Sequence, residues 1–278
     1  MRWRGRRGSV NVSDRRGSRG VVRGGAGGLG VLAIVLVGWL LGVDLTPLLG
    51  EAEVRAPTRP STAAEEEAGA FVSVVLADTE DVWAAVFRDQ VRESYHPPTL
   101  VLFSGMTNSG CGQASAATGP FYCPLDGRAY LDTAFFTALE RRFGAGGDFA
   151  AAYVVAHEVA HHVQREIGIL GEAHAIRRQV SESESNAISV RLELQADCLA
   201  GLWAHHAQER FAILEEGDVA EAMNAAAQIG DDILQQRTGT VRPETFTHGT
   251  GEQRQDWFRT GFETGEIRAC DTFEAEPI

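Results

Sequence analysis

The 278-residue chain contains no lysine and no Cys-x-x-Cys pair, and it shows no basic patch interleaved with aromatic residues. The missing cysteine pair argues against a zinc site built from cysteine. The first 43 residues carry a net charge of +7 and the remaining 235 carry −20. A domain as acidic as this, without a basic patch, argues against nucleic acid as a partner.

Charge is also missing from residues 24–43, an apolar run of twenty residues that spans about 30 Å as a helix. Residues 1–23 before it are rich in arginine and hold one acid, Asp14. This asymmetry predicts a cytoplasmic N-terminal segment without a core and an exported remainder. A cleaved signal peptide is the alternative, but no convincing small-x-small cleavage site follows. We therefore expect one uncleaved, single-pass transmembrane helix.

Residues 44–70 are expected to form a linker, because Pro, Ala, Glu and Thr dominate residues 51–70. Residues 71–278 then form the folded domain. Hydrophobic periodicity predicts the following elements in it: strands over 99–104 and 128–132, and helices over 79–95, 133–143, 148–168, 185–208, 218–236 and 253–261. Helices and a few short strands together indicate an α+β, mostly helical fold.

Four cysteines lie in the domain that we expect to be exported. Cys111 and Cys123 close a short Gly/Ser/Ala-rich loop and most simply form a disulfide, with two free thiols as the alternative. Cys198 and Cys270 remain and can pair with each other, although the sequence does not fix this connectivity.

Residues 157–161, H-E-V-A-H, lie in the middle of the predicted helix 148–168. His157 and His161 project from one helix face, one turn apart, which suits a single metal ion. Glu158 lies beside the open coordination position, where it can act as general base. Most flanking residues are apolar, so the helix is expected to be buried, and buried imidazoles and carboxylates are costly without a partner.

A third metal ligand must come from elsewhere in the chain. The metzincin continuation is absent, since Gln164 and Ile167 occupy its Gly and His positions, and His162 points away from His161. Glu193 and Asp197 lie four residues apart on an apolar helix. We expect Glu193 to bind the metal and Asp197 to accept the free N–H of a ligating histidine. The alternative places Glu193 on a solvated face.

The opening MRWRGRRGSVNVSDRRG, the HEVAHHVQ helix and the LELQADCLAGLWAH helix together resemble the bacterial putative neutral zinc metallopeptidases. The likeness covers nearly the whole chain. It implies a zincin-like, membrane-anchored metallopeptidase of the gluzincin kind, in which His157, His161 and Glu193 bind one zinc ion and Glu158 activates water. The segment F-T-H-G-T also resembles that family, and its His248 is predicted to donate a hydrogen bond to the oxyanion. A plain surface histidine is the alternative.

These features predict a zinc-dependent endopeptidase acting on a peptide or protein substrate. Strand 129–132 could offer an edge to an extended substrate. The expected location is the bacterial cell membrane, with a cytoplasmic N-terminus and an extracytoplasmic catalytic domain. One rival is a membrane-anchored scaffold that binds zinc without catalysis. The other is a di-iron protein using Glu158, His161, Glu93 and His96.

Overall fold

The computed structural model describes residues 1–16, 62–115 and 118–275. The helices in these ranges are α2 Ala63–Val86 with its π-helical extension η2 Phe87–Val91, α3 Ala134–Phe143, α4 Asp148–Glu166, α5 Ile169–Arg177, α6 Glu182–Phe211, α7 Asp218–Gln228, α8 Asp231–Thr238, η3 Pro243–Thr245, α9 Gly251–Thr264 and η4 Ile267–Cys270. The strands are β1 Val12–Asp14, β2 Thr99–Phe103, β3 Met106–Ser109, β4 Gly112–Ser115, β5 Phe121–Cys123 and β6 Arg128–Asp132. A mostly helical α+β fold is confirmed.

The main sheet has the strand order β1-β2-β6-β5, with β1, β2 and β6 parallel and β5 antiparallel to β6. In β2, Leu100 and Leu102 face the main core, whereas Val101 and Phe103 pack in a second cluster. Because both faces are covered, the strand reads as one apolar run. Strand β6 lies between β2 and β5, so the expectation that residues 129–132 form a free edge is wrong. On this side of the sheet, the edge strand is β5.

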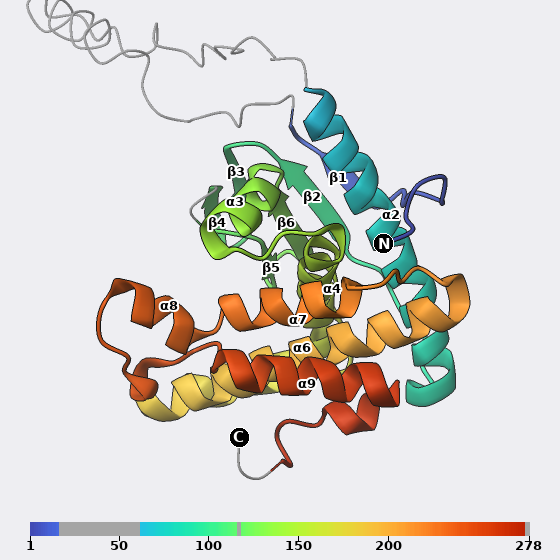
Figure 1. The fold of residues 1–278 in the computed structure, drawn as a ribbon. Helices are drawn as coiled ribbons and strands as arrows, with labels where there is room; N and C mark the ends of the chain where they lie inside the picture. The colour runs from blue at the N-terminus through green and yellow to red at the C-terminus, as the bar shows by residue number, and fades with distance from the viewer. Residues whose placement is uncertain (17–61, 116–117, 276–278) are drawn as a thin grey trace, which may run out of the picture.

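The N-terminal residues belong to this fold. Met1 and Trp3 are buried in the main core, and β1 pairs in parallel with β2 (Figure 1). The guanidinium of Arg6 donates to Asp78 at 2.7 Å. The expectation that no core residue lies within residues 1–23 is therefore wrong for residues 1–16, because Met1 and Trp3 are buried and Arg4, Arg6 and Arg7 pair with acids of α2.

Helix α2 begins earlier than the sequence suggests. Thr62 and Glu65 form a capping box, in which each side chain accepts a hydrogen bond from the other's backbone N–H. Residues 62–70, expected in the linker, thus form the cap and first turns of a helix that already buries Gly69. The alanines and glutamates there favour a helix as much as an unstructured segment.

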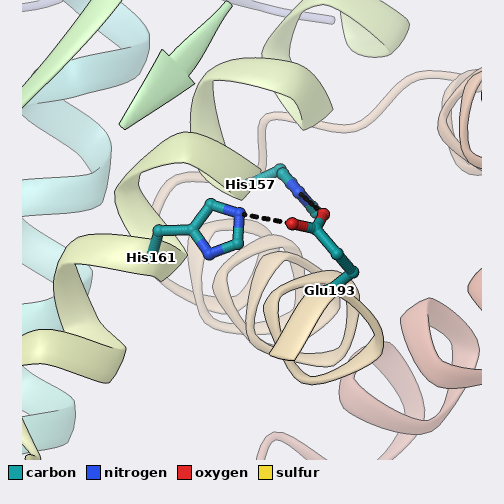
Figure 2. Close-up of side chains that lie close together, drawn as sticks. All are labelled: His157, His161 and Glu193. Carbon is teal, nitrogen blue, oxygen red and sulfur yellow. Dashed lines mark hydrogen bonds and ion pairs between the residues drawn. The ribbon is translucent and has the colours of Figure 1, made fainter. Parts of the chain in front are cut away.

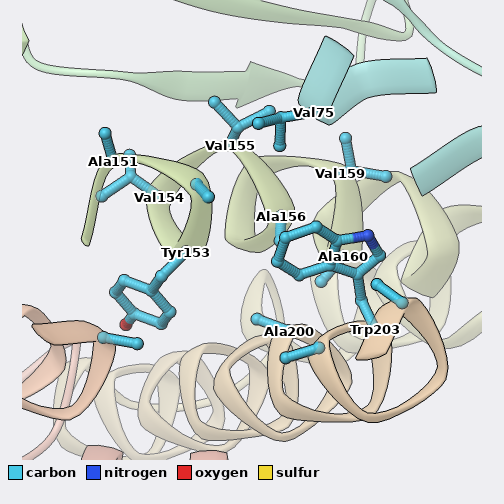
Figure 3. Packing of buried hydrophobic residues seen from close by; sticks show 14 of the residues in the cluster. Val75, Ala151, Tyr153, Val154, Val155, Ala156, Val159, Ala160, Ala200 and Trp203 are labelled. Carbon is cyan, nitrogen blue, oxygen red and sulfur yellow. The ribbon is translucent and has the colours of Figure 1, made fainter. Parts of the chain in front are cut away.

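Helix α4 lies at the centre of the molecule. It packs against α2, α6 and α7 and touches β5 and β6 (Figure 1). Its apolar side chains meet Val75 of α2 and Ala200 and Trp203 of α6 (Figure 3). The chain leaves α4 through Gly168, whose φ of 86° is left-handed, as expected of a helix terminator. At the other end of α4, Asp148 lies in the first turn of the helix and pairs with the Met1 amine.

Helices α6 and α9 cross in backbone contact. A Cβ added to Gly201 would lie 2.0 Å from the Phe258 carbonyl oxygen, and one added to Gly261 would lie 1.8 Å from that of Cys198. Glycine at both positions lets the helices approach closely. This contact fixes the position of α9 beside the residues of α6 that face α4.

Both disulfides are present: Cys111–Cys123 joins the β3–β4 turn to β5, and Cys198–Cys270 joins α6 to η4. The predicted helix over 218–236 is two helices, α7 and α8, separated at Gly230, which lies against the backbone of Gly251.

None of the helices within residues 1–16, 62–115 and 118–275 is long and apolar enough to cross a membrane. The predicted membrane segment, residues 24–43, lies outside the described residues.

Candidate metal centre

The structure brings the three predicted metal ligands together. His157 and His161 project from adjacent turns of α4, and their ring centroids lie 4.9 Å apart. Glu193 of α6 places Oε2 3.1 Å from His157 Nε2 and Oε1 3.5 Å from His161 Nε2 (Figure 2). The three ligand atoms lie within 4.8 Å of one another.

This donor set fits a zinc ion. Ligand atoms about 2.0 to 2.1 Å from a tetrahedral zinc lie about 3.3 to 3.4 Å from one another, close to the two nitrogen to oxygen distances above. Two imidazoles and one carboxylate are ligands that zinc prefers, and they leave one position open. All three side chains are less than a fifth exposed, so a bound ion would lie in a largely enclosed site.

The second nitrogen of each imidazole also has a partner. His157 Nδ1 lies 2.9 Å from Asp197 Oδ1, and His161 Nδ1 lies 2.9 Å from Gln164 Oε1. Because these oxygens accept an N–H, both rings turn Nε2 toward Glu193. Asp197 thus lies where the sequence predicted it. The sequence reasoning missed Gln164, which lies one turn after His161, a spacing that could have suggested it.

Asp197 lies in a fully buried polar network. Arg254 of α9 donates to both of its oxygens, at 2.8 and 3.0 Å, and the Tyr153 hydroxyl donates to Oδ1 at 2.5 Å. Burial alone raises the pKa of Asp197, but Arg254 and His157 lower it more strongly, so the group stays a carboxylate. Arg254, only 2% exposed, was not predicted from the sequence.

A chain of amides continues from His161 toward the C-terminal segment. Gln164 Nε2 donates to the Leu192 carbonyl oxygen and to Gln195 Oε1. Gln195 Nε2 in turn donates to the Cys270 carbonyl oxygen at 3.0 Å. The orientation of His161 therefore depends on contacts that reach the Cys198–Cys270 disulfide.

Glu158 lies beside these ligands and is partly exposed. Burial raises the pKa of its carboxyl, and the two neighbouring histidines partly oppose that effect. Within the described ranges, no hydrogen bond occupies the Glu158 carboxylate. A raised pKa and a free carboxylate are the properties that a general base requires.

Without metal, the site binds protons tightly. Burial lowers the pKa of His157, but Asp197 and Glu193 outweigh it and raise the pKa to about 10. Burial raises the pKa of Glu193, yet the two histidines bring it well below its usual range. An ion that binds here must displace protons from imidazole, so its affinity is expected to depend on pH.

His248 lies in the loop before α9, next to Glu193 of α6. A Cβ added to the following residue, Gly249, would lie 3.2 Å from Leu194 and 3.3 Å from Val190, residues that flank Glu193. His248 Nδ1 lies 3.2 Å from Asp231 Oδ1, and that hydrogen bond raises the pKa of His248. The side chain is 49% exposed.

Asp231, the first residue of α8, holds the loop before α9. Its Oδ2 accepts the backbone N–H groups of Thr247 and His248, both at 2.6 Å. It therefore fixes the loop as well as the His248 ring. Its role follows from the break between α7 and α8, which the sequence reasoning did not identify.

The residues required by the di-iron hypothesis do not meet. His96 pairs with Glu166 and is 79% exposed. Neither Glu93 nor His96 belongs to any cluster of three or more possible metal ligands in the described part of the chain. His162 also stays away from the site, because its ring is bound by the Tyr122 hydroxyl and the His96 carbonyl.

The sequence of this chain matches a family model over residues 1–273. The family is described as putative neutral zinc metallopeptidase. The chain belongs to this family. Membership supports zinc as the metal and hydrolysis as the class of reaction, in agreement with the donor set described above.

The relatives include the protein named "Uncharacterized protein YpfJ" from Escherichia coli strain K12, which is 47% identical over 98% of this chain and 99% of its own. "Uncharacterized protein Rv2575" from Mycobacterium tuberculosis strain H37Rv is 45% identical over 76% of this chain and 74% of its own. No solved structure matches the chain.

Proposed function

We propose that this chain is a zinc-dependent endopeptidase that hydrolyses peptide bonds in a peptide or protein substrate. The observation that carries the proposal is the Glu158 carboxylate, unpaired within the described ranges, beside three ligand atoms that lie within 4.8 Å of one another. A site that stores a metal ion, or that holds one for structural reasons, would not need a free base next to its ligands.

The reaction follows from the positions of these side chains. A zinc ion bound by His157, His161 and Glu193 would supply a Lewis acid that polarises water and the scissile carbonyl. Glu158 takes a proton from the attacking water and passes it to the leaving amine. His248, positioned by Asp231, donates from Nε2 to the developing oxyanion.

The surrounding residues keep the ligands in place. Asp197 and Gln164 hold the Nδ1–H groups of the two histidines, so each ring presents Nε2. Arg254 keeps Asp197 ionised inside the core. The ligands therefore need little rearrangement when the metal binds.

We also propose that residues 24–43 anchor the protein in the membrane of a bacterial cell, with the catalytic domain on the extracytoplasmic side, where the two disulfides can form. The pairing of β1 with β2 adds a constraint. A single crossing between residues 16 and 62 would separate the two strands. Residues 1–16 and the domain must lie on one side for β1 to occupy its place, so we propose an anchor that does not cross the bilayer, and we retain neither the single crossing nor the cytoplasmic N-terminus.

The test compares the full-length chain with Glu158→Gln and with Glu216→Gln, a control in which an exposed acid is replaced. Zinc content and the degradation of an unfolded protein are measured together. We expect Glu158→Gln to keep its zinc and lose activity by about 10²- to 10⁴-fold, and Glu216→Gln to match the parent. Equal activity in parent and Glu158→Gln would refute the mechanism. Zinc in all three without cleavage of varied substrates would favour the scaffold.

A further inference from the structure

A second cluster of possible metal ligands lies near the end of α6, away from the proposed catalytic residues. It consists of His205, His206 and Glu209, whose ligand atoms lie within 4.8 Å of one another. His205 Nε2 lies 3.4 Å from Glu209 Oε1, and His206 Nδ1 lies 3.3 Å from Glu209 Oε2. These distances match the spacing of about 3.3 to 3.4 Å expected around a tetrahedral zinc.

The other nitrogen of each ring is bound to the end of α9. His205 Nδ1 donates to the Phe262 carbonyl oxygen at 2.8 Å, and His206 Nε2 donates to that of Gly265 at 2.9 Å. A carbonyl oxygen only accepts, so these two nitrogens must carry the protons. In the neutral rings, the lone pairs are then on His205 Nε2 and His206 Nδ1, the two atoms that face Glu209.

Gly265 leaves room for the first of these rings. Its φ of 63° is left-handed, and an added Cβ would lie 2.5 Å from His205 Cδ2 and 2.7 Å from Nε2. Any other residue would displace the imidazole that offers the ligand atom. The α9 terminus thus provides two carbonyl acceptors and a side-chain-free surface beneath the cluster.

We propose that His205, His206 and Glu209 bind a second metal ion of the zinc type, with water completing the coordination. The cluster has two imidazoles and one carboxylate, the same donor set as the catalytic site. Both rings are about a quarter exposed and Glu209 is 63% exposed, so the ion enters directly from solvent. Because this site is more open, it binds zinc more weakly than the site on α4.

The bound ion would tie the last turns of α6 to the C-terminal end of α9. These helices also carry Glu193, Asp197 and Arg254, so zinc at the second site would stabilise the helix pair that supports the catalytic centre. The competing account is that the imidazoles only cap the carbonyls of α9 and that Glu209 pairs with them without a metal.

The experiment titrates the metal-free, full-length chain with Zn²⁺ in a chelating buffer that fixes the free zinc concentration. Bound zinc is then counted by elemental analysis for the parent, Glu209→Gln and the control Glu216→Gln, both at exposed positions. His157→Ala marks the catalytic site separately. We expect two equivalents in the parent and the control, and one each in Glu209→Gln and His157→Ala.

Thermal unfolding provides the second measurement. Zinc added beyond one equivalent should raise the melting temperature of the parent and of Glu216→Gln but not of Glu209→Gln. One equivalent in the parent, lost only in His157→Ala, would overturn the second site and leave the catalytic proposal intact. Two equivalents in Glu209→Gln would overturn the second site as well. A His206→Gln variant repeats the test with the second ligand should Glu209→Gln fold poorly.

Discussion

Arg254→Met is predicted to destabilise the fold because it removes the counter-charge of a buried carboxylate. The guanidinium is 2% exposed and makes two hydrogen bonds to Asp197 and one to Tyr153, at 2.8 to 3.2 Å. Its removal leaves a fully buried carboxylate without its main counter-charge. Breaking one partner of such a pair costs about 3 to 5 kcal/mol.

For a domain of this size, that loss corresponds to a drop in melting temperature of roughly 6 to 20 °C. The assay is thermal and urea unfolding of the zinc-loaded, full-length chain. Arg259→Met is the matched control, since Arg259 lies on the same helix, is 45% exposed and pairs only with Asp256 among the described residues. Its substitution should change the free energy of unfolding by less than about 0.5 kcal/mol.

The reasoning also predicts non-additivity. Asp197→Asn in the Arg254→Met background removes the stranded charge, so the double variant should be less destabilised than the sum of the two single variants. Arg254→Met and Arg259→Met with equal stability would refute the buried ion pair. Strict additivity would show that the two groups do not interact.

In the metal-free chain, the pKa of His157 is about 10 instead of 6.5, so protonation stabilises the fold fully below pH 6.5 and this contribution is lost as pH rises toward 10. Urea unfolding at neutral and alkaline pH should show that loss; a constant free energy would contradict it. Val10 and Leu125 are 91% and 78% exposed and belong to one folded unit. Cysteines introduced at these two positions should therefore react alike with an impermeant maleimide in intact cells. Reaction at one position only would contradict the β1–β2 pairing. Replacing Cys198 and Cys270 by alanine opens a cross-link spanning 72 residues, so the unfolding free energy should fall by about 4 kcal/mol and zinc should dissociate faster. Unchanged zinc release would disprove the link to His161.

The candidate metal ligands were readable from the sequence because helical spacing and burial are local signals. His157 and His161 share a face at four-residue spacing, and so do Glu193 and Asp197. Each pair stands in an apolar helix, where polar residues need a partner. The contact between Glu193 and the two histidines is the one long-range part of this prediction. The apolar patterning around both pairs was enough to predict it.

Arg254 and Asp231 could not be identified in the same way. In its own segment, Arg254 resembles any surface arginine of a polar helix. Its burial results from the close crossing of α6 and α9, which depends on glycines 60 residues apart, Gly201 and Gly261. Asp231 points inward only because the chain turns at Gly230 and starts a new helix there.

The expectation that the N-terminal segment has no core was wrong for residues 1–16 for an electrostatic reason. Arginines before an apolar run usually mark the cytoplasmic side of a membrane. Here Arg6 and Arg7 instead meet Asp78 and Asp81 on α2. Composition cannot distinguish an arginine that faces phospholipid from one that faces a folded acidic helix.

The contact of Gly201 with Phe258 and of Gly261 with Cys198 makes two residues without side chains responsible for the geometry of the candidate metal centre. Even an alanine at either position would act as a wedge and move Arg254 away from Asp197. Loss of activity in such a variant would therefore arise from altered helix spacing, although every chemically active group would still be present. Screens for inactive variants should find these glycines as readily as the metal ligands.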